Sequence, residues 1–233
     1  FTSIAARTDL GLVRQGNEDS ALTHHRLIAV ADGMGGAVGG EIASRIAIQT
    51  IAGIVKSIGM MDSDPDSQSG ILQDAAMRID EEISLAIKER PDLEGMGTTL
   101  TALAPIEQSV ALLHIGDSRA YRLRGDTLTQ LSHDHTVVQE LLDQGRIKPE
   151  ELEDHPQRSM LTQALMGRGV RSSQELEVEQ SPLHLFPAKR DDIYLLCSDG
   201  LSSVLSDDEI RKILLTGNLE QAANNLIAVT RDG

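Results

Sequence analysis

Apolar residues recur along this chain with two different periods, and the change of period separates helical from strand regions. Between residues 42 and 58, and again between 72 and 87, apolar positions return every three or four residues, which is typical of amphipathic helices. From residue 98 to 131, short β-branched or apolar runs alternate with brief polar turns. Connections this short join antiparallel neighbours, because a parallel crossover needs about a dozen residues or more. The pattern predicts an antiparallel meander accompanied by helix pairs, an α+β fold.

The same patterning predicts further elements on either side of this central region. The expected strands are 3–8, 27–31, 98–104, 109–115, 119–124, 127–131 and 193–197. The expected helices are 42–58, 72–87, 136–145, 206–215 and 219–229, the fourth opened by a Ser206 to Glu209 capping box. Residues 146–169 are polar and irregular, as in a surface excursion. Neither a repeat nor an interdomain linker is found in the sequence, so a single domain over residues 1–233 is expected.

The stretch 27–41 places Asp32 and Gly33 directly after an apolar run and follows them with a glycine-rich loop. A dinucleotide fingerprint counted from Gly33 fails at Val38, and a phosphate loop fails because Glu41 stands where lysine is required. Oxygen ligands and a flexible backbone suit Mg²⁺ or Mn²⁺ better. The loop alone leaves two interpretations open, a cation site and an ordinary glycine turn.

The amino-acid composition limits which kinds of binding partner are expected. The chain has 36 Asp and Glu against 21 Lys and Arg, a formal net charge of −15, and few aromatic residues. Such a surface repels nucleic acid and anionic membrane and offers little base stacking, so neither partner is expected. A single cysteine, Cys197, fits a reducing compartment. The sequence lacks an initiator Met and a signal-peptide layout. We therefore expect a cytoplasmic domain trimmed from a longer protein, and whether that longer protein carries a membrane anchor is left open.

Three separate apolar runs end in an aspartate beside a glycine: Asp32, Asp117 and Asp199. One such pair is an ordinary turn signal, but three indicate strand ends that converge on one site. Converging carboxylates cannot all stay ionised without cations between them. Two divalent ions about 3.5–4 Å apart can activate water and hold both ends of a displacement at phosphorus. Arg14 is then the best candidate to grip phosphoryl oxygens.

Other chemistry is disfavoured by the sequence. Cys197 lies in an apolar strand without an arginine at cysteine-phosphatase spacing, and a buried thiol is the better interpretation. No Cys and His spacing supports zinc. Ser118 and Ser198 lack a nucleophile elbow. The histidines considered as zinc ligands and assigned instead to capping and packing are His133, His135 and His155.

Taken in order, several motifs resemble the metal-dependent protein phosphatases, the protein phosphatase 2C family, in its bacterial branch. The motifs are Gly11 to Arg14 with Asn17 to Asp19, Val30 to Gly36, Gly97 to Thr99, Ile115 to Tyr121, Asp134 to Thr136, and Ser198 to Leu201. They span the chain nearly from end to end. The resemblance implies a four-layer sandwich of two antiparallel β-sheets flanked by helix pairs.

The resemblance also implies a metal site with two core Mn²⁺ or Mg²⁺ ions and a third, weaker one. Asp32 would bridge the core ions, the Gly33 carbonyl would be a ligand, and Asp199 would bind one ion. Asp117 would hold the third ion together with Asp199, and some bacterial members add a ligand near Ser159.

The implied activity is that of a protein-serine/threonine phosphatase, in which bimetal-activated water attacks phosphoserine or phosphothreonine directly. Arg14 would bind the phosphate, while Glu18 and Asp19 orient water. Residues 146–158 match a variable flap beside the site. The expected partners are phosphorylated proteins, including a Ser/Thr protein kinase, and the chain is expected to be a monomer.

Two departures from the family pattern keep an alternative open. Ala37 stands where bacterial relatives usually carry histidine, a proposed participant in acid catalysis, and the sequence ends at Gly233 before the family's closing Gly-x-x-Asp-Asn motif. The alternative is a catalytically impaired, phosphatase-like module that binds phosphoprotein partners.

Overall fold

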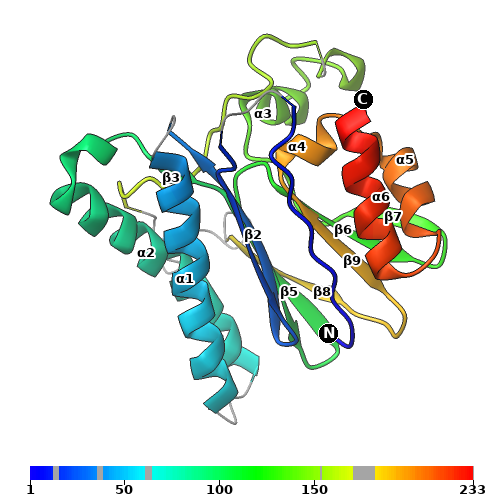
Figure 1. Cartoon of the computed structure of the whole chain (residues 1–233), viewed down its shortest axis with the longest axis horizontal. Helices are drawn as coiled ribbons and strands as arrows, with labels where there is room; N and C mark the ends of the chain where they lie inside the picture. The colour runs from blue at the N-terminus through cyan, green and yellow to red at the C-terminus, as the bar shows by residue number, and fades with distance from the viewer. Residues whose placement is uncertain (13–15, 36–38, 61–64, 153, 170–181, 233) are drawn as a thin grey trace.

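The computed structural model describes residues 1–12, 16–35, 39–60, 65–152, 154–169 and 182–232, and its strands form two antiparallel sheets (Figure 1). The larger sheet has the order β1-β2-β4-β5-β8, with β3 also paired to β2, and the smaller sheet has the order β7-β6-β9. The strands are β1 (Asp19–His24), β2 (Leu27–Met34), β3 (Gly97–Thr98), β4 (Leu100–Ile106), β5 (Ser109–Ile115), β6 (Arg119–Arg124), β7 (Thr127–Gln130), β8 (Leu183–Pro187) and β9 (Ile193–Cys197).

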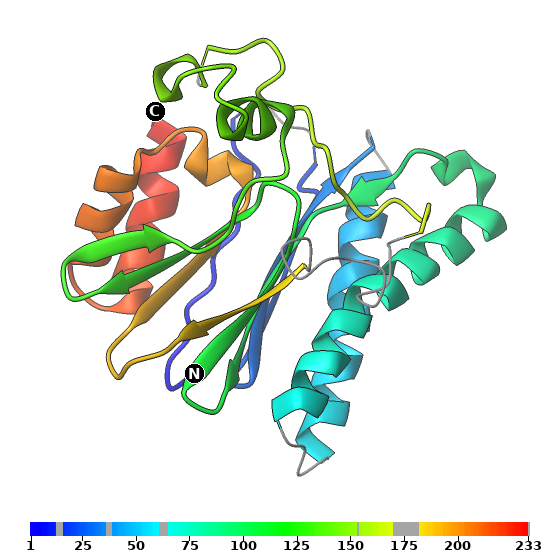
Figure 2. The same ribbon diagram turned by 180° about the vertical axis from the view of Figure 1, so that it is seen from behind.

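Helices cover the outer face of each sheet, which makes four layers. Two long helices lie on the larger sheet and two shorter ones on the smaller sheet, as the front and back views show (Figures 1 and 2). The helices are α1 (Gly39–Met60), α2 (Pro65–Glu89), α3 (Val137–Asp143), α4 (Asp199–Ser202), α5 (Asp207–Leu214) and α6 (Leu219–Asp232), with single 3₁₀ turns at Pro91–Leu93 and Pro149–Glu151. The predicted α+β sandwich with flanking helix pairs is confirmed.

The alternation of side chains along β5 shows how the layers are held together. Val110 and Leu112 belong to the apolar layer between the two sheets, whereas Ala111 and Leu113 pack beneath α1 and α2. Both faces of the strand are therefore buried, which explains why its sequence is an almost continuous apolar run rather than an alternating one.

The buried face of α1 differs from the predicted stripe. Ala43 and Ala47 are fully buried together with Ile51, while Ile42 and Ile46 are only partly buried. Small side chains at the closest contact let the helix approach the sheet, and the isoleucines fill the margins of the contact. The prediction is confirmed at Ile51, Ile54 and Val55, which are buried, and was wrong only in the first turns of the helix.

Several predicted elements need correction. Residues 3–8 do not form a strand; they run extended past α6, where Arg7 Nε donates to Asn224 Oδ1 at 2.6 Å and pairs with Glu220. The first strand is β1, at the edge of the larger sheet, and β8 is a second strand not predicted from the sequence. Strands β5 and β6 are consecutive but lie in different sheets, so the predicted meander is interrupted where the chain crosses the sandwich.

Among the helices in the described part of the chain, none combines the length and apolarity needed to cross a membrane.

Candidate metal centre

The three strand-end aspartates meet at one end of the sandwich. Asp32 lies near the end of β2, Asp117 lies in the β5–β6 turn, and Asp199 begins α4 directly after β9. Asp19, the first residue of β1, is the antiparallel partner of Asp32. Each aspartate therefore lies at the end of a different strand, and Asp117 lies where the chain crosses from the larger sheet to the smaller one.

These residues surround a cleft with a volume of about 540 Å³. Its lining includes the acidic residues Glu18, Asp32, Asp117 and Asp199, together with Gly33. An irregular segment contributes Ser159, 161–164 and Met166, none of which is charged. The cleft lining therefore combines an acidic group with an uncharged segment.

Two of the acidic residues in the cleft have raised pKa values. Burial, followed by repulsion from Asp19 and Asp199, raises the pKa of Asp32 to about 9. Burial and the charge of Asp199 raise the pKa of Asp117 to about 6. Without a cation, the folded chain therefore holds a proton on Asp32 at neutral pH, because ionising it would place like charges together at low dielectric.

The backbone around Asp32 is held closely by its neighbours. The Asp32 N–H donates to Thr99 Oγ1 at 3.0 Å, and the Asp32 carbonyl accepts from Thr98 Oγ1 and from the Thr99 N–H, both at 2.9 Å. A Cβ added to Gly33 would lie 2.1 Å from the Gly40 carbonyl oxygen, so only glycine lets the start of α1 approach here.

The donor atoms fit hard divalent cations. Carboxylates, a backbone carbonyl and a hydroxyl are the oxygen ligands that Mg²⁺ and Mn²⁺ prefer. Within the described ranges, no three His, Cys, Asp or Glu side chains are arranged as ligands of a single ion. An ion held here would therefore combine pairs of carboxylates such as Asp32 and Asp199 with the Gly33 carbonyl and with water.

Most of the predicted site residues come together. Glu18, Asp32, Gly33, Asp117, Ser159 and Asp199 all line the cleft. Asp19 is not among the lining residues, and its carboxylate accepts a 2.7 Å hydrogen bond from Ser198 Oγ. Arg14, the expected phosphate ligand, and Ala37 lie outside the described residues.

The sequence interpretation did not find the residues that support the cleft. Thr98 and Thr99 were noted only as part of a motif, and residues 161–166 were grouped with an irregular excursion. Asp80 of α2 was also missed, although a carboxylate beside the apolar stripe of Ile79 and Ile83 was a visible signal.

The alternative chemistries remain disfavoured in the structure. Cys197 is buried, and burial raises the pKa of its thiol to about 12, which suits a packed thiol and not a nucleophile. Burial also lowers the pKa of His135 to about 4. Its Nδ1 accepts a 3.0 Å hydrogen bond from the Gly116 N–H, a structural role next to Asp117.

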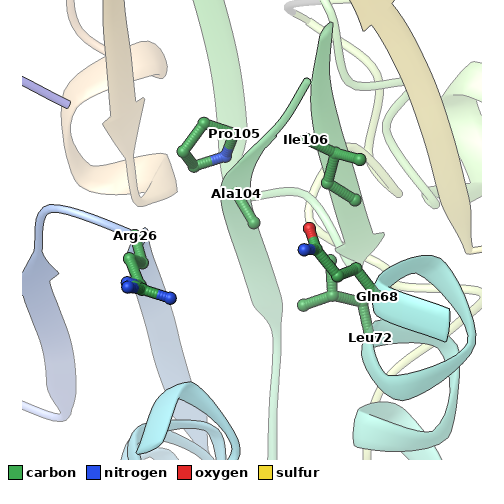
Figure 3. A pocket seen from close by; sticks show the side chains of 6 residues that line it. All are labelled: Arg26, Gln68, Leu72, Ala104, Pro105 and Ile106. Atoms are coloured by element: carbon green, nitrogen blue, oxygen red, sulfur yellow. The ribbon is translucent and has the colours of Figure 1, made fainter. Parts of the chain in front are cut away.

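A smaller hollow of about 220 Å³ lies between β4 and the beginning of α2, with Arg26 at one rim and Gln68 and Leu72 at the other (Figure 3). Ala104, Pro105 and Ile106 complete its lining, and none of these six residues is acidic. It is not a candidate for the metal site.

Comparison with known proteins gives consistent matches. A family model described as Protein phosphatase 2C matches residues 11–226. The chain is 44% identical to Serine/threonine protein phosphatase PstP of Mycobacterium tuberculosis over 230 residues, which are 98% of this chain and 42% of that protein. It is 34% identical to Serine/threonine phosphatase stp of Listeria innocua, covering 89% of this chain and 81% of that protein.

Solved structures agree. The crystal structure of the M. tuberculosis phosphatase PstP/Ppp is 42% identical, with a TM-score of 0.87 and coverage of 98% of this chain and 91% of that one. The PstP catalytic domain in complex with two manganese ions is 40% identical, with a TM-score of 0.84 and coverage of 98% and 90%. The chain spans less than half the length of full PstP.

Proposed function

The chain belongs to the protein phosphatase 2C family, and from this membership we propose that it is a metal-dependent phosphatase acting on phosphoserine and phosphothreonine in proteins. The observation that carries the proposal is the meeting of Asp32, Asp117 and Asp199 around one cleft. Burial, together with repulsion from neighbouring carboxylates, raises the pKa of Asp32, and divalent cations would relieve that cost.

The residues assigned to the ions are those that the family resemblance implies, and their presence in the cleft lining supports the assignment. Asp32, the Gly33 carbonyl and Asp199 would hold two Mn²⁺ or Mg²⁺ ions, and Asp117 with Asp199 would hold a third, weaker one, with Ser159 at the edge of the set. When bound, such ions supply Lewis-acid stabilisation of phosphoryl charge and lower the pKa of water.

The chain's own groups have separate tasks. Arg14 is expected to bind phosphoryl oxygens in a bidentate manner. Glu18, which lines the cleft, and Asp19 would accept hydrogen bonds and so orient water. Neither Cys197, with its raised pKa, nor Ser198, which donates to Asp19, is suited to attack phosphorus. Both observations support the attack by water, without a phosphoenzyme, that the family resemblance implies.

We further propose that residues 1–233 act as one catalytic domain, monomeric and cytoplasmic, within or apart from a longer protein. Its substrates are phosphorylated proteins, and a Ser/Thr kinase is among them. The strongly acidic surface supports a protein substrate over nucleic acid.

The test is hydrolysis of a phosphothreonine peptide with Mn²⁺, with Mg²⁺ and with EDTA. We expect cation-dependent turnover that Asp32→Asn lowers at least about a hundredfold, since the lost carboxylate removes several kcal/mol of charge stabilisation. Asp126→Asn, the same change on an exposed turn, should keep the wild-type rate. Absence of turnover with either ion would refute the activity and favour a binding module. Full turnover by Asp32→Asn would refute the assigned metal site.

A further inference from the structure

Asp80 on α2 is not among the lining residues of the cleft but contacts the segment that contributes Ser159, 161–164 and Met166 to that lining, here termed the cleft wall (residues 159–169). We propose that Asp80 is a positioning residue that fixes the cleft wall and thereby sets the affinity for phosphoprotein substrates. The proposal rests on the proposed function for its substrate and on the contacts below for its geometry.

The contacts are three hydrogen bonds from the backbone to one carboxylate. Asp80 Oδ1 accepts from the Met166 N–H at 2.9 Å and from the Gly167 N–H at 2.7 Å, and Oδ2 accepts from the Gly169 N–H at 2.7 Å. The Asp80 residue is only 4% exposed. Hydrogen bonds to an ionised acceptor are about twice as strong as neutral ones, so these bonds hold the end of the wall against α2.

A buried aspartate at position 80 would destabilise the fold if it did not accept hydrogen bonds from the cleft wall. Asp80 sits between helix positions whose side chains, such as Ile79 and Ile83, are fully buried. Burying a carboxylate is unfavourable unless hydrogen bonds replace its hydration. The three amides of the cleft wall supply that replacement, and an apolar residue at this position would leave them without the carboxylate.

Backbone conformation at Gly167 is matched to the same contact. Its φ is +71°, and an added Cβ would lie 2.8 Å from the Ser84 backbone nitrogen on α2. A side chain here would be strained and would also push the wall away from the helix. Helix and wall are therefore fitted to each other on both sides of the contact.

From this anchor the wall reaches the metal centre through backbone bonds. Leu165 pairs with Thr98, with the Thr98 N–H donating to Leu165 O at 2.9 Å and the Leu165 N–H donating back at 3.0 Å. Thr98 Oγ1 in turn donates to the Asp32 carbonyl. Further along the wall, the Thr162 N–H donates to His135 O at 2.9 Å.

Loss of the anchor should affect binding more than chemistry. The wall lines the cleft with hydroxyl, amide and apolar groups such as Thr162, Gln163 and Met166, which suit contacts to a peptide. Asp32 is also held by contacts that do not involve the wall, its N–H bond to Thr99 Oγ1 and its pairing with Asp19. The expected signature is a higher KM for phosphopeptides at nearly constant kcat.

The main test is Asp80→Asn. Its amide can still accept from Met166 and Gly167, but its NH₂ group would face the Gly169 N–H, so one bond is lost and two donors meet. We expect KM for a phosphothreonine peptide to rise on the order of tenfold with kcat within about twofold. KM for a small aryl phosphate, which does not extend along the wall, should change much less.

Gly167→Ala disturbs the same contact from the side of the cleft wall and should also raise KM for the peptide at nearly constant kcat. This second variant tests the proposal independently if Asp80→Asn does not fold. Asp74→Asn, an exposed change of the same charge on α2, is the matched control and should match the wild type. If both variants lose stability and kcat with KM unchanged, or if KM rises equally for peptide and aryl phosphate, the proposal is wrong.

Amide hydrogen exchange provides a readout that needs no activity. Peptides covering 160–169 should exchange faster in Asp80→Asn and in Gly167→Ala than in the wild type, with β4 and β5 unchanged. If the wild-type chain hydrolyses no phosphopeptide, the proposed function fails, and exchange still decides whether Asp80 holds the wall. Unchanged exchange in both variants would overturn the anchor itself.

Discussion

Thr99 joins two aspartate-bearing segments through one hydroxyl group. Its Oγ1 accepts from the Asp32 N–H and lies 2.8 Å from Ser118 Oγ, next to Asp117. In the bond with Asp32 the amide is the donor, whereas in the bond with Ser118 either hydroxyl can donate to the other. The residue is 1% exposed, so water cannot replace either bond. Replacing the Thr99 hydroxyl by a methyl group would therefore remove hydrogen bonds to the segments that carry Asp32 and Asp117.

We predict that Thr99→Val lowers the free energy of unfolding by about 1–3 kcal/mol, the cost of leaving a buried donor without its acceptor. Urea denaturation measures this directly. Thr129→Val, the same substitution at an exposed position of β7, serves as the control and should change stability little. Equal effects of the two substitutions would show that the Thr99 hydroxyl is not needed to hold Asp32.

At the scale of elements, an ion pair ties β6 to the turn before β9. Arg124 Nε and Nη2 donate to the two Asp192 oxygens, each at 2.7 Å. The Asp192 side chain is 1% exposed and also accepts from the Lys189 N–H at 2.8 Å. These bonds, with that from Arg124 the largest cause, lower the pKa of Asp192 to about 2. The pair thus stabilises the smaller sheet at its edge.

The sign of the pH dependence follows from this shift. A carboxyl group whose pKa is lower in the folded state stabilises the fold above its unfolded pKa and loses that effect as pH falls toward 2. Asp192→Asn should cost on the order of 2 kcal/mol at about pH 7, with the difference from wild type shrinking below about pH 4. Denaturation at several pH values measures this. Asp191→Asn, in the same turn but exposed, should stay close to wild type. Parallel stability curves for Asp192→Asn and wild type would contradict the assignment.

Elements with strong periodicity could be predicted from the sequence because burial on one face dictates it. The helices from 42 and from 72 were of this kind, and the strand Ser109–Ile115 could be predicted for a different reason, because burial on both faces makes it a nearly continuous apolar run. Strands β1 and β8 were missed because they are half-buried edges of the sheet. Their pairing with β2 and β5, and not their own pattern, makes them strands.

The residues of the candidate site also fall into two groups, those that a local sequence pattern predicts and those that only the fold brings together. Asp32, Asp117 and Asp199 could be predicted because each follows a strand directly and carries its own turn signal. The bond from Asp80 to Met166 joins residues 86 positions apart, and no local pattern connects them. Only the packing of α2 against the end of the wall brings the two together, so the anchor is visible in the fold and not in the sequence.

At the scale of the whole molecule, a chain of net charge −15 folds with several acidic groups gathered at one end of its sandwich. Folding therefore works against repulsion that binding of cations would remove. The pKa of Asp32, raised to about 9, carries this cost: a group with a raised folded pKa loses stability as pH rises from its unfolded value to its folded one. Without cations the fold should be less stable near neutral pH than in mild acid, as far as Asp32 is concerned.

We predict that the wild type and Asp32→Asn differ in melting temperature in one direction without cations and in the opposite direction with Mn²⁺. In EDTA at about pH 7.5, Asp32→Asn should melt above the wild type, because folding of the wild type requires Asp32, ionised in the unfolded chain, to take up a proton, and the amide avoids that cost. With free Mn²⁺ at about 100 times its dissociation constant, the wild type should gain about 2.7 kcal/mol, or roughly 5–10 °C in Tm, and the variant far less. NaCl at the same ionic strength controls for screening and should raise both melting temperatures alike. If Asp32→Asn melted below the wild type in EDTA, or gained as much as the wild type from Mn²⁺, Asp32 would not be the residue through which cations stabilise this fold.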